Sequence, residues 1–240
     1  MAIPTGRIID KLDSYYASNN LKGAEDLLTY WEEECRKQGD NGGLLTISNE
    51  QIGFYRRNKN VIKGRKAIDT ALSIVDDKDP GSAVIYVNIA TTLKSYGDSE
   101  GALKYYSCAK DIFEKNDMTK TYEFAAFLNN YGTTLADIGR EDEAMISYEN
   151  AVTILKELGT NHTEIAVSYV NMAHVEESRD PSKVEMLLDM AWEELNNEPF
   201  PRGGSYAFAI SKCAPSFEHF GRAYEARALM EVADEIYKRS

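Results

Sequence analysis

The sequence predicts an all-α fold, a solenoid of about six helical hairpins, from three observations. Residues 88–109 and 130–151 match each other at eight positions when they are aligned at an offset of 42. Within each copy, apolar residues recur at i, i+3, i+4 and i+7, which places them on one face of an α-helix. Glycine recurs midway through each copy, where one helix ends and the next begins. A two-helix unit repeated along the chain indicates a solenoid.

The first helix of each hairpin is expected to bury one apolar stripe. Units begin near residues 83, 125, 166 and 207, which is a spacing of 41 or 42. The stripe occupies positions 4, 7, 8 and 11 of a unit, and the unit that begins at 166 has a glutamate at position 11, which weakens its core. The stripe residues are Tyr86, Ile89, Ala90 and Leu93; Leu128, Tyr131, Gly132 and Leu135; and Ile210, Cys213, Ala214 and Phe217.

The second helix of each hairpin repeats a small, large, small pattern at positions 20, 24 and 27. Small residues let two helices approach closely, and the large residue fills the gap between them. In the unit that begins at 166 the pattern comes one residue early, after a short turn in which Pro181 is placed at the first helical position. The pattern residues are Ala102, Tyr106 and Ala109; Ala144, Tyr148 and Ala151; Val184, Leu188 and Ala191; and Ala226, Met230 and Ala233.

The turn between the two helices has its own signals. Gly97, Gly139 and Gly221 follow the first helices, where a left-handed backbone conformation favours glycine. Acidic residues at 98–100 and 141–143 then suit the positive end of the second helix. Pro215 lies inside a first helix and removes a hydrogen bond there, at a cost of about 3 kcal/mol unless the helix kinks. We therefore expect a kinked terminal repeat.

These features resemble the tetratricopeptide repeat (TPR), which has a small residue at position 8, an aromatic residue near 11 and Ala-x3-aromatic in the second helix. The long period is similar to that of kinesin light chains and of bacterial peptide-pheromone sensors, whereas the usual unit has about 34 residues. The resemblance implies a right-handed α-solenoid of about six TPR-like hairpins, with about twelve helices. Its first helices would line a concave face.

The chain is expected to form one solenoid domain over residues 1–240. Its only Pro/Gly-rich linker, 196–205, is short for a domain boundary. The matches at the N-terminus are weaker, and the first-helix register of the second hairpin is ambiguous by one residue. The expected hairpins cover 7–37, 44–76, 83–115, 122–157, 163–195 and 205–238.

Composition limits the classes of partner and compartment. The net charge of −12 repels phosphate backbones, so we expect no nucleic-acid partner. The basic cluster at 56–66 is interrupted and is interpreted as a solvated helix face. We expect no membrane association, because no apolar run approaches the roughly 20 residues that cross a bilayer and residues 1–16 lack a signal-peptide pattern. Three scattered cysteines fit a reducing cytoplasm.

No catalytic, metal or cofactor site is predicted. The chain has no Gly-rich phosphate loop, no His-x3-His pair and no CxxC motif. His174 and His219 both fall on first helices, but at different repeat positions, so a metal site between them is disfavoured. Cys213 is at an inward position and is expected to be a packed thiol. The sequence therefore predicts that the protein is not an enzyme.

The first-helix positions that face away from the partner helix are the candidate binding residues. They are Asn88, Thr91, Lys94, Asn129, Asn130, Thr133, Asn171, His174 and Lys212. Asn88, Asn130 and Asn171 share position 6, so stacking predicts a row of carboxamides along the groove. In the peptide-binding families that the chain resembles, such asparagines hold the main chain of an extended peptide. The alternative is that they bond adjacent helices and hold the repeats in register, and the two roles are compatible.

Function is therefore expected to lie in binding. The first hypothesis is a scaffold or adaptor that holds an extended peptide or protein segment in the concave groove, as a monomer or weak homodimer. The alternative is a bacterial regulatory sensor that responds to a short peptide. Because no DNA-binding helix-turn-helix is visible, such a sensor would act on a protein target. Recognition of an acidic chaperone tail is not expected, because the chain lacks the paired lysine and asparagine of carboxylate-clamp repeats. Position 5 of the successive repeats holds Val87, Asn129 and Val170 instead.

Overall fold

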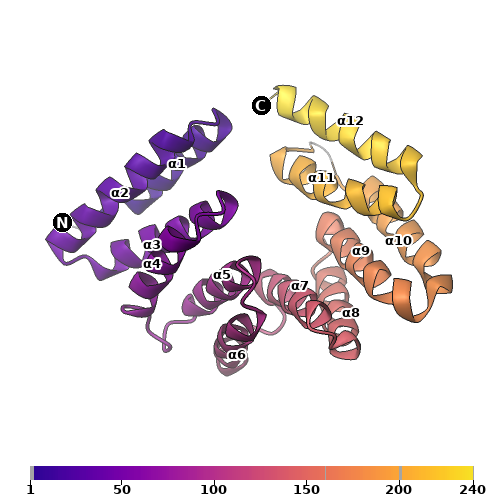
Figure 1. The fold of residues 1–240 in the computed structure, drawn as a ribbon, viewed down its shortest axis with the longest axis horizontal. Helices are drawn as coiled ribbons and strands as arrows, with labels where there is room; N and C mark the ends of the chain where they lie inside the picture. The colour runs from indigo at the N-terminus through magenta and orange to yellow at the C-terminus, as the bar shows by residue number, and fades with distance from the viewer. Residues whose placement is uncertain (1–2, 160, 200–201, 240) are drawn as a thin grey trace. The chain divides into compact units, whose positions relative to one another are not determined.

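The protein is all-helical in the computed structural model, which describes residues 3–159, 161–199 and 202–239. Over these residues it forms twelve α-helices, one short 3-10 helix and no strand (Figure 1). The predicted fold class is confirmed. The helices are α1 Thr5–Ala17, α2 Leu21–Gln38, α3 Asn41–Arg57, α4 Val61–Leu72, α5 Ser82–Ser95, α6 Ser99–Lys115, α7 Tyr122–Asp137, α8 Glu141–Leu158, α9 His162–Arg179, η1 Pro181–Lys183, α10 Val184–Asn197, α11 Gly204–His219 and α12 Ala223–Arg239.

Each odd-numbered α-helix packs against the even-numbered α-helix that follows it, from α1 with α2 to α11 with α12. The helices thus form six hairpins. The second ends at Leu72, before the expected residue 76, because residues 73–75 leave α4 in a hydrogen-bonded turn. None of the described helices has both the length and the apolar composition needed to cross a bilayer.

The chain divides into two compact units, Met1–Asn116 and Asp117–Ser240. In the first unit, α3 packs against both α1 and α5. In the second, α9 packs against both α7 and α11. First helices of successive hairpins are therefore neighbours within each unit, as the repeat pattern requires. The single domain expected from the sequence stays a prediction.

The glycine at position 8 and the tyrosine at position 24 form the closest contact of the fourth hairpin. Tyr148 is 1% exposed, and its ring lies over Gly132 of α7. A Cβ atom added to Gly132 would lie 2.8 Å from Cε1 of Tyr148. Ala144 and Ala151, which flank Tyr148 along α8, are fully buried. Small residues therefore set the helix spacing here, and one aromatic ring fills it.

Gly132→Ala is expected to destabilise the protein by about 1–3 kcal/mol, because the new methyl group overpacks a filled site. Gly53→Ala is the matched control, since Gly53 is also a helical glycine but a Cβ atom added to it would meet no atom within 4 Å. That variant is expected to gain about 0.5–1 kcal/mol from helix propensity. Urea unfolding measures both changes. Equal gains in the two variants would contradict the packing described here.

The turn signals are also confirmed. Gly97, Gly139 and Gly221 adopt φ values of 82°, 77° and 80°, in the left-handed region. Asp98 caps α6, because its carboxylate accepts a hydrogen bond from the N–H of Gly101 at 2.9 Å. These interactions satisfy backbone groups that a helix end would otherwise leave unpaired.

Two details of the last hairpins differ from expectation. Pro181 opens the 3-10 helix η1 and not α10 itself, which begins at Val184. Glu176, at position 11, is buried in spite of its charge, and its carboxylate lies 3.3 Å from Nζ of Lys183. An ion pair thus takes the place of an apolar contact. Helix α11 continues through Pro215.

The expected role of Met230 is wrong. Its side chain is 41% exposed, whereas the equivalent Tyr106 and Tyr148 are 1% exposed. Met230 and Pro215 line an open pocket of about 470 Å³ on the α11–α12 hairpin. The unbranched methionine leaves this gap unfilled. Leu229 is the large buried residue of this turn of α12.

Candidate functional site

A groove of about 600 Å³ lies within the second unit, on the side of its first helices. Three neighbouring helices, α7, α9 and α11, supply its walls. Three of the predicted binding residues line it: Asn129, Asn130 and Lys212. The full lining is Ala126, Asn129 and Asn130 from α7, Glu164 and Val167 from α9, and Gly204, Ser205, Phe208, Ala209 and Lys212 from α11.

Helical periodicity explains why these residues share one face. On α11, positions 205, 208, 209 and 212 follow the i, i+3, i+4, i+7 spacing of a single stripe. The opposite stripe of the same helix buries Ile210 and Phe217. The packing that fixes the core therefore also directs the groove residues away from it.

Asn129 and Asn130 present complementary hydrogen-bonding groups to the groove. Oδ1 of Asn129 accepts a hydrogen bond from Oγ of the buried Ser168 on α9, at 2.9 Å. Nδ2 of Asn130 donates to the carbonyl oxygen of Ala126, also at 2.9 Å. Over the described residues, nothing accepts from Nδ2 of Asn129 and nothing donates to Oδ1 of Asn130. Adjacent side chains thus offer one donor and one acceptor, each held in place by the partner of its other atom.

The groove also has an aromatic surface and charges of both signs. Phe208 is 59% exposed, and Nζ of Lys212 lies 5.4 Å from the centroid of its ring. Oε1 of Glu164 accepts a hydrogen bond from the Tyr122 hydroxyl at 2.9 Å, and Oε2 accepts one from Oγ1 of Thr163. Burial, together with the charge of Glu164, raises the pKa of Tyr122, so its hydroxyl remains a donor.

Asn88, in the first unit, holds neighbouring helices together. Its Nδ2 donates to the backbone oxygen and to Oδ1 of Asn49 on α3, at 3.1 and 2.9 Å. Its Oδ1 accepts from Nη1 of Arg56 at 2.8 Å. Burial, followed by the nearby charge of Arg57, lowers the pKa of Arg56. The register role therefore applies to Asn88. The expectation that 56–66 forms a solvated face is wrong at Arg56, which bridges α3 and α5.

The predicted row of asparagines is divided between the units. Asn88 lies in the first unit, and Asn130 and Asn171 lie in the second. Asn171 is half-buried on α9, and its side chain makes no hydrogen bond to the parts of the chain that are described. The row as a whole stays a prediction.

The two predicted threonines join the helices of their own hairpins. Oγ1 of Thr133 donates to the backbone oxygen of Asn129 at 2.9 Å and accepts from the Tyr148 hydroxyl at 3.3 Å. Thr91 repeats the arrangement with Tyr106, at 3.1 Å. Neither threonine lines the groove of the second unit, nor do Lys94 and His174.

Sequence analysis missed Phe208, which gives the groove its exposed aromatic surface. A signal was present, because Phe208 occupies position 2 of its repeat, as Ala126 and Val167 do in their repeats. Treating position 2 of the last repeat as a groove position would have identified Phe208. Glu164 comes before the first position of its repeat, so the repeat numbering did not identify it as a groove residue.

Neither a family model nor a curated protein matches the chain. Solved structures do match it. The crystal structure of BtubC (BKLC) from P. vanneervenii aligns over 98% of this chain and 89% of that chain, with a TM-score of 0.52 and 16% identity. A Podosopora anserina putative kinesin light chain with nearly identical TPR-like repeats aligns over 80% of this chain and 94% of that chain, with a TM-score of 0.56 and 17% identity.

The chain has a TPR-like repeat fold. The resemblance inferred from the small residues of the two helices is therefore confirmed at the level of the fold. At this low identity the likeness carries no function across. The function has to be argued from the groove itself.

Proposed function

We propose that the protein is an interaction scaffold that binds an extended segment of a partner protein in the groove of its second unit. One observation carries the proposal: the unpaired donor of Asn129 and the unpaired acceptor of Asn130, among the described residues, line the same groove as the exposed ring of Phe208. The TPR-like fold of the chain supports a role in protein interaction in general. No catalytic residue is assigned.

The paired carboxamides match the chemistry of a peptide main chain. Each residue of an extended peptide offers one N–H donor and one C=O acceptor. Oδ1 of Asn130 can accept from the N–H, while Nδ2 of Asn129 donates to the C=O. Such hydrogen bonds are independent of the side chains of the peptide, so they would set its path and not its identity.

Specificity would come from the rest of the groove. Two hydrogen bonds at about 0.5–1.5 kcal/mol net each fall short of the roughly 8 kcal/mol that micromolar binding requires. Phe208 supplies apolar surface, whose burial adds about 1.5–3 kcal/mol per side chain. Lys212 and Glu164 carry opposite charges. They favour a peptide with an acidic group near Lys212 and a basic group near Glu164. We infer an amphipathic ligand with an apolar side chain seated on Phe208.

Phe208→Ala is expected to weaken peptide binding about 30-fold or more, since aromatic anchors at interfaces typically contribute about 2 kcal/mol or more. The probes are peptides selected against the wild-type protein from a random-sequence display library, and fluorescence anisotropy measures their affinity for each variant. Phe208 is on the surface, so the variant should fold as the wild type does, which circular dichroism checks.

Tyr224→Ala is the matched control. Tyr224 is an 81% exposed aromatic residue of the same unit, on α12, and it lies outside the groove. Its loss should leave the affinity of the selected peptides unchanged. Peptides that bind Phe208→Ala as tightly as wild type, or that are lost with Tyr224→Ala instead, would refute the proposed site.

The alternative of a peptide sensor, the cytoplasmic location, the lack of a nucleic-acid partner and the monomeric or weakly dimeric state stay predictions. The groove proposal does not depend on them, because its residues all belong to one unit of one chain.

A further inference from the structure

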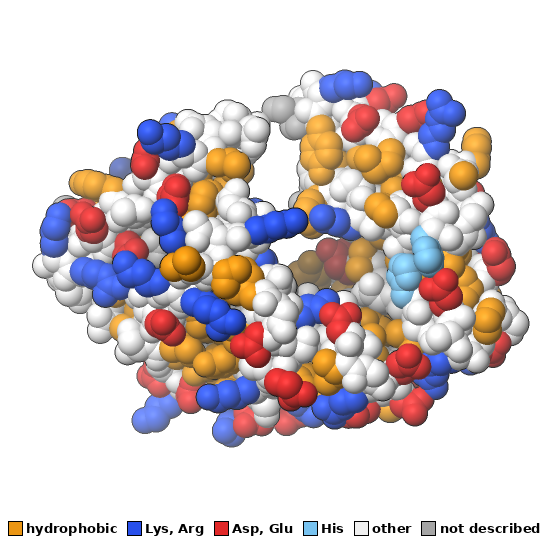
Figure 2. All heavy atoms as spheres, viewed as in Figure 1, with side chains coloured by type: hydrophobic (Ala, Val, Ile, Leu, Met, Phe, Trp, Pro, Cys, Tyr) orange, Lys and Arg blue, Asp and Glu red, His pale blue; other side chains and the backbone are white. Residues whose placement is uncertain are grey.

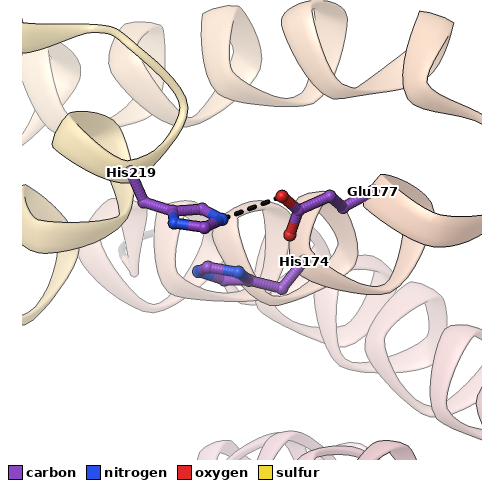
Figure 3. A group of neighbouring side chains, drawn as sticks. All are labelled: His174, Glu177 and His219. Carbon is purple, nitrogen blue, oxygen red and sulfur yellow. Dashed lines mark hydrogen bonds and ion pairs between the residues drawn. The ribbon is translucent and has the colours of Figure 1, made fainter.

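His174, Glu177 and His219 form a compact group in the second unit, apart from the residues that line the groove. His174 and Glu177 lie one turn apart on α9, and His219 is the last residue of α11 (Figure 3). The possible ligand atoms of the three side chains all lie within 4.8 Å of one another. In Figure 2 the pale-blue histidine side chains gather at one place on the surface, beside acidic side chains.

The packing of α9 against α11 brings the group together. Residues 42 apart in the chain face each other there. Nε2 of His174 lies 2.8 Å from Oγ of Ser216, and Nε2 of His219 lies 2.9 Å from Oε1 of Glu177. The ring of Phe220 packs against both imidazoles, with centroid distances of 4.9 and 4.8 Å. The repeat offset therefore places both histidines beside one carboxylate, with an aromatic ring restricting their rotation.

The three side chains offer atoms that bind divalent metal ions. A neutral imidazole binds metal ions through a ring nitrogen, and the carboxylate of Glu177 supplies an oxygen atom within 4.8 Å of the ring nitrogens of both histidines.

We propose that His174, Glu177 and His219 bind a divalent transition-metal ion, for which Zn²⁺ is the best fit. Two imidazole nitrogens and one carboxylate form a ligand set that zinc uses in proteins. In a tetrahedral zinc site, ligand atoms at about 2.0–2.2 Å from the metal lie about 3.4 Å from each other. Side-chain movements of about 1 Å would bring these donors to that spacing.

A metal ion here would link two neighbouring repeats and keep an open coordination position. The side chains of His219 and Glu177 are 52% and 49% exposed, so water or a group from a partner can complete the coordination shell. The ion would replace the hydrogen bond between His174 and Ser216 and the one between His219 and Glu177. The proposal is independent of peptide binding, and it departs from the expectation that the chain holds no metal.

Zn²⁺ is expected to bind the chain of residues 1–240 at one ion per chain, and isothermal titration calorimetry measures this binding. Glu177→Gln and His219→Gln should each weaken binding at least about tenfold, because removing a ligand costs more than removing an outer-shell partner. Both residues are near the surface and both are replaced by a polar side chain of similar size, so the fold should persist, which circular dichroism checks. Zn²⁺ should also raise the unfolding midpoint of the wild type more than the midpoints of Glu177→Gln and His219→Gln.

His162→Gln is the matched control, because His162 lies at the other end of α9 and pairs with Glu194. It should bind Zn²⁺ as the wild type does. Bound Co²⁺ should show the visible bands of nitrogen and oxygen ligands without a thiolate band, which separates this site from one at the half-buried Cys108. Equal affinities in all variants, or a thiolate band, would overturn the proposal.

Discussion

Tyr148→Ala is expected to destabilise the protein by about 3–5 kcal/mol, the range for truncating a large buried aromatic residue. The ring of Tyr148 is 1% exposed and packs directly on the backbone of α7 at Gly132. Glycine has no side chain that could move into the space left by the ring, and the neighbouring Ala144 and Ala151 are too small to fill it. The variant would therefore retain a cavity between the two helices of its hairpin.

Urea unfolding, monitored by circular dichroism, measures this loss. Tyr148→Phe keeps the ring and removes only the hydrogen bond to Thr133, so it should lose about 0.5–1.5 kcal/mol. Tyr224→Ala truncates an exposed tyrosine of the same unit and should stay within about 0.5 kcal/mol of wild type. If Tyr148→Ala were no less stable than Tyr148→Phe, the ring could not be the element that fills the gap.

The stability of the protein is expected to fall steeply between about pH 10 and pH 12. Burial raises the pKa of Tyr148 from 10.0 to about 12. Burial, followed by the charge of Glu25, raises the pKa of Tyr55 to about 12 as well. The folded protein therefore holds these protons more tightly than the unfolded chain does.

The direction of the effect follows from proton binding. Below pH 10 both states are protonated and the stabilising contribution is complete. As the pH rises from 10 towards 12, the unfolded chain ionises first and gains free energy, so the stability of the folded state decreases. For Tyr148 alone, a pKa raised from 10.0 to about 12 corresponds to about 3 kcal/mol. The buried thiol of Cys213, whose pKa burial raises from 9.0 to about 12, contributes in the same direction.

Urea midpoints measured from pH 8 to pH 12 check this dependence. Tyr148→Phe cannot ionise at this position, so its profile should be flatter than that of the wild type. Its stability at neutral pH should be slightly lower, through the lost hydrogen bond. Parallel profiles for the two proteins would show that the Tyr148 hydroxyl does not titrate with unfolding.

The fold could be predicted from the sequence because its core repeats. Small residues at positions 8 and 20 and a large residue at position 24, such as Gly132, Ala144 and Tyr148, recur along the chain, because close packing of two helices admits few other residues there. The same argument failed at Met230. Repeat position states which direction a side chain faces, but not whether anything lies beyond it, and the side chain of Met230 is 41% exposed.

The site was harder to predict, because its residues are not defined by packing. Asn88, Asn129 and Asn130 are chemically alike, and the hydrogen bonds with Asn49 and Arg56 separate the register role of Asn88 from an exposed one. His174 was placed in the groove by its repeat position. Its actual neighbours depend on which residues of α9 and α11 face each other, and no single-repeat pattern contains that information.

The central claim, that the groove of the second unit binds an extended peptide, is tested most directly by photo-cross-linking. A peptide selected against the wild-type protein, carrying a photoreactive residue at each position in turn, is cross-linked to the chain of residues 1–240, and the cross-links are mapped by mass spectrometry. We predict cross-links to α7, α9 and α11, at or beside the residues that line the groove, moving along it in order with the photoreactive position. Cross-links confined to other helices would contradict the claim.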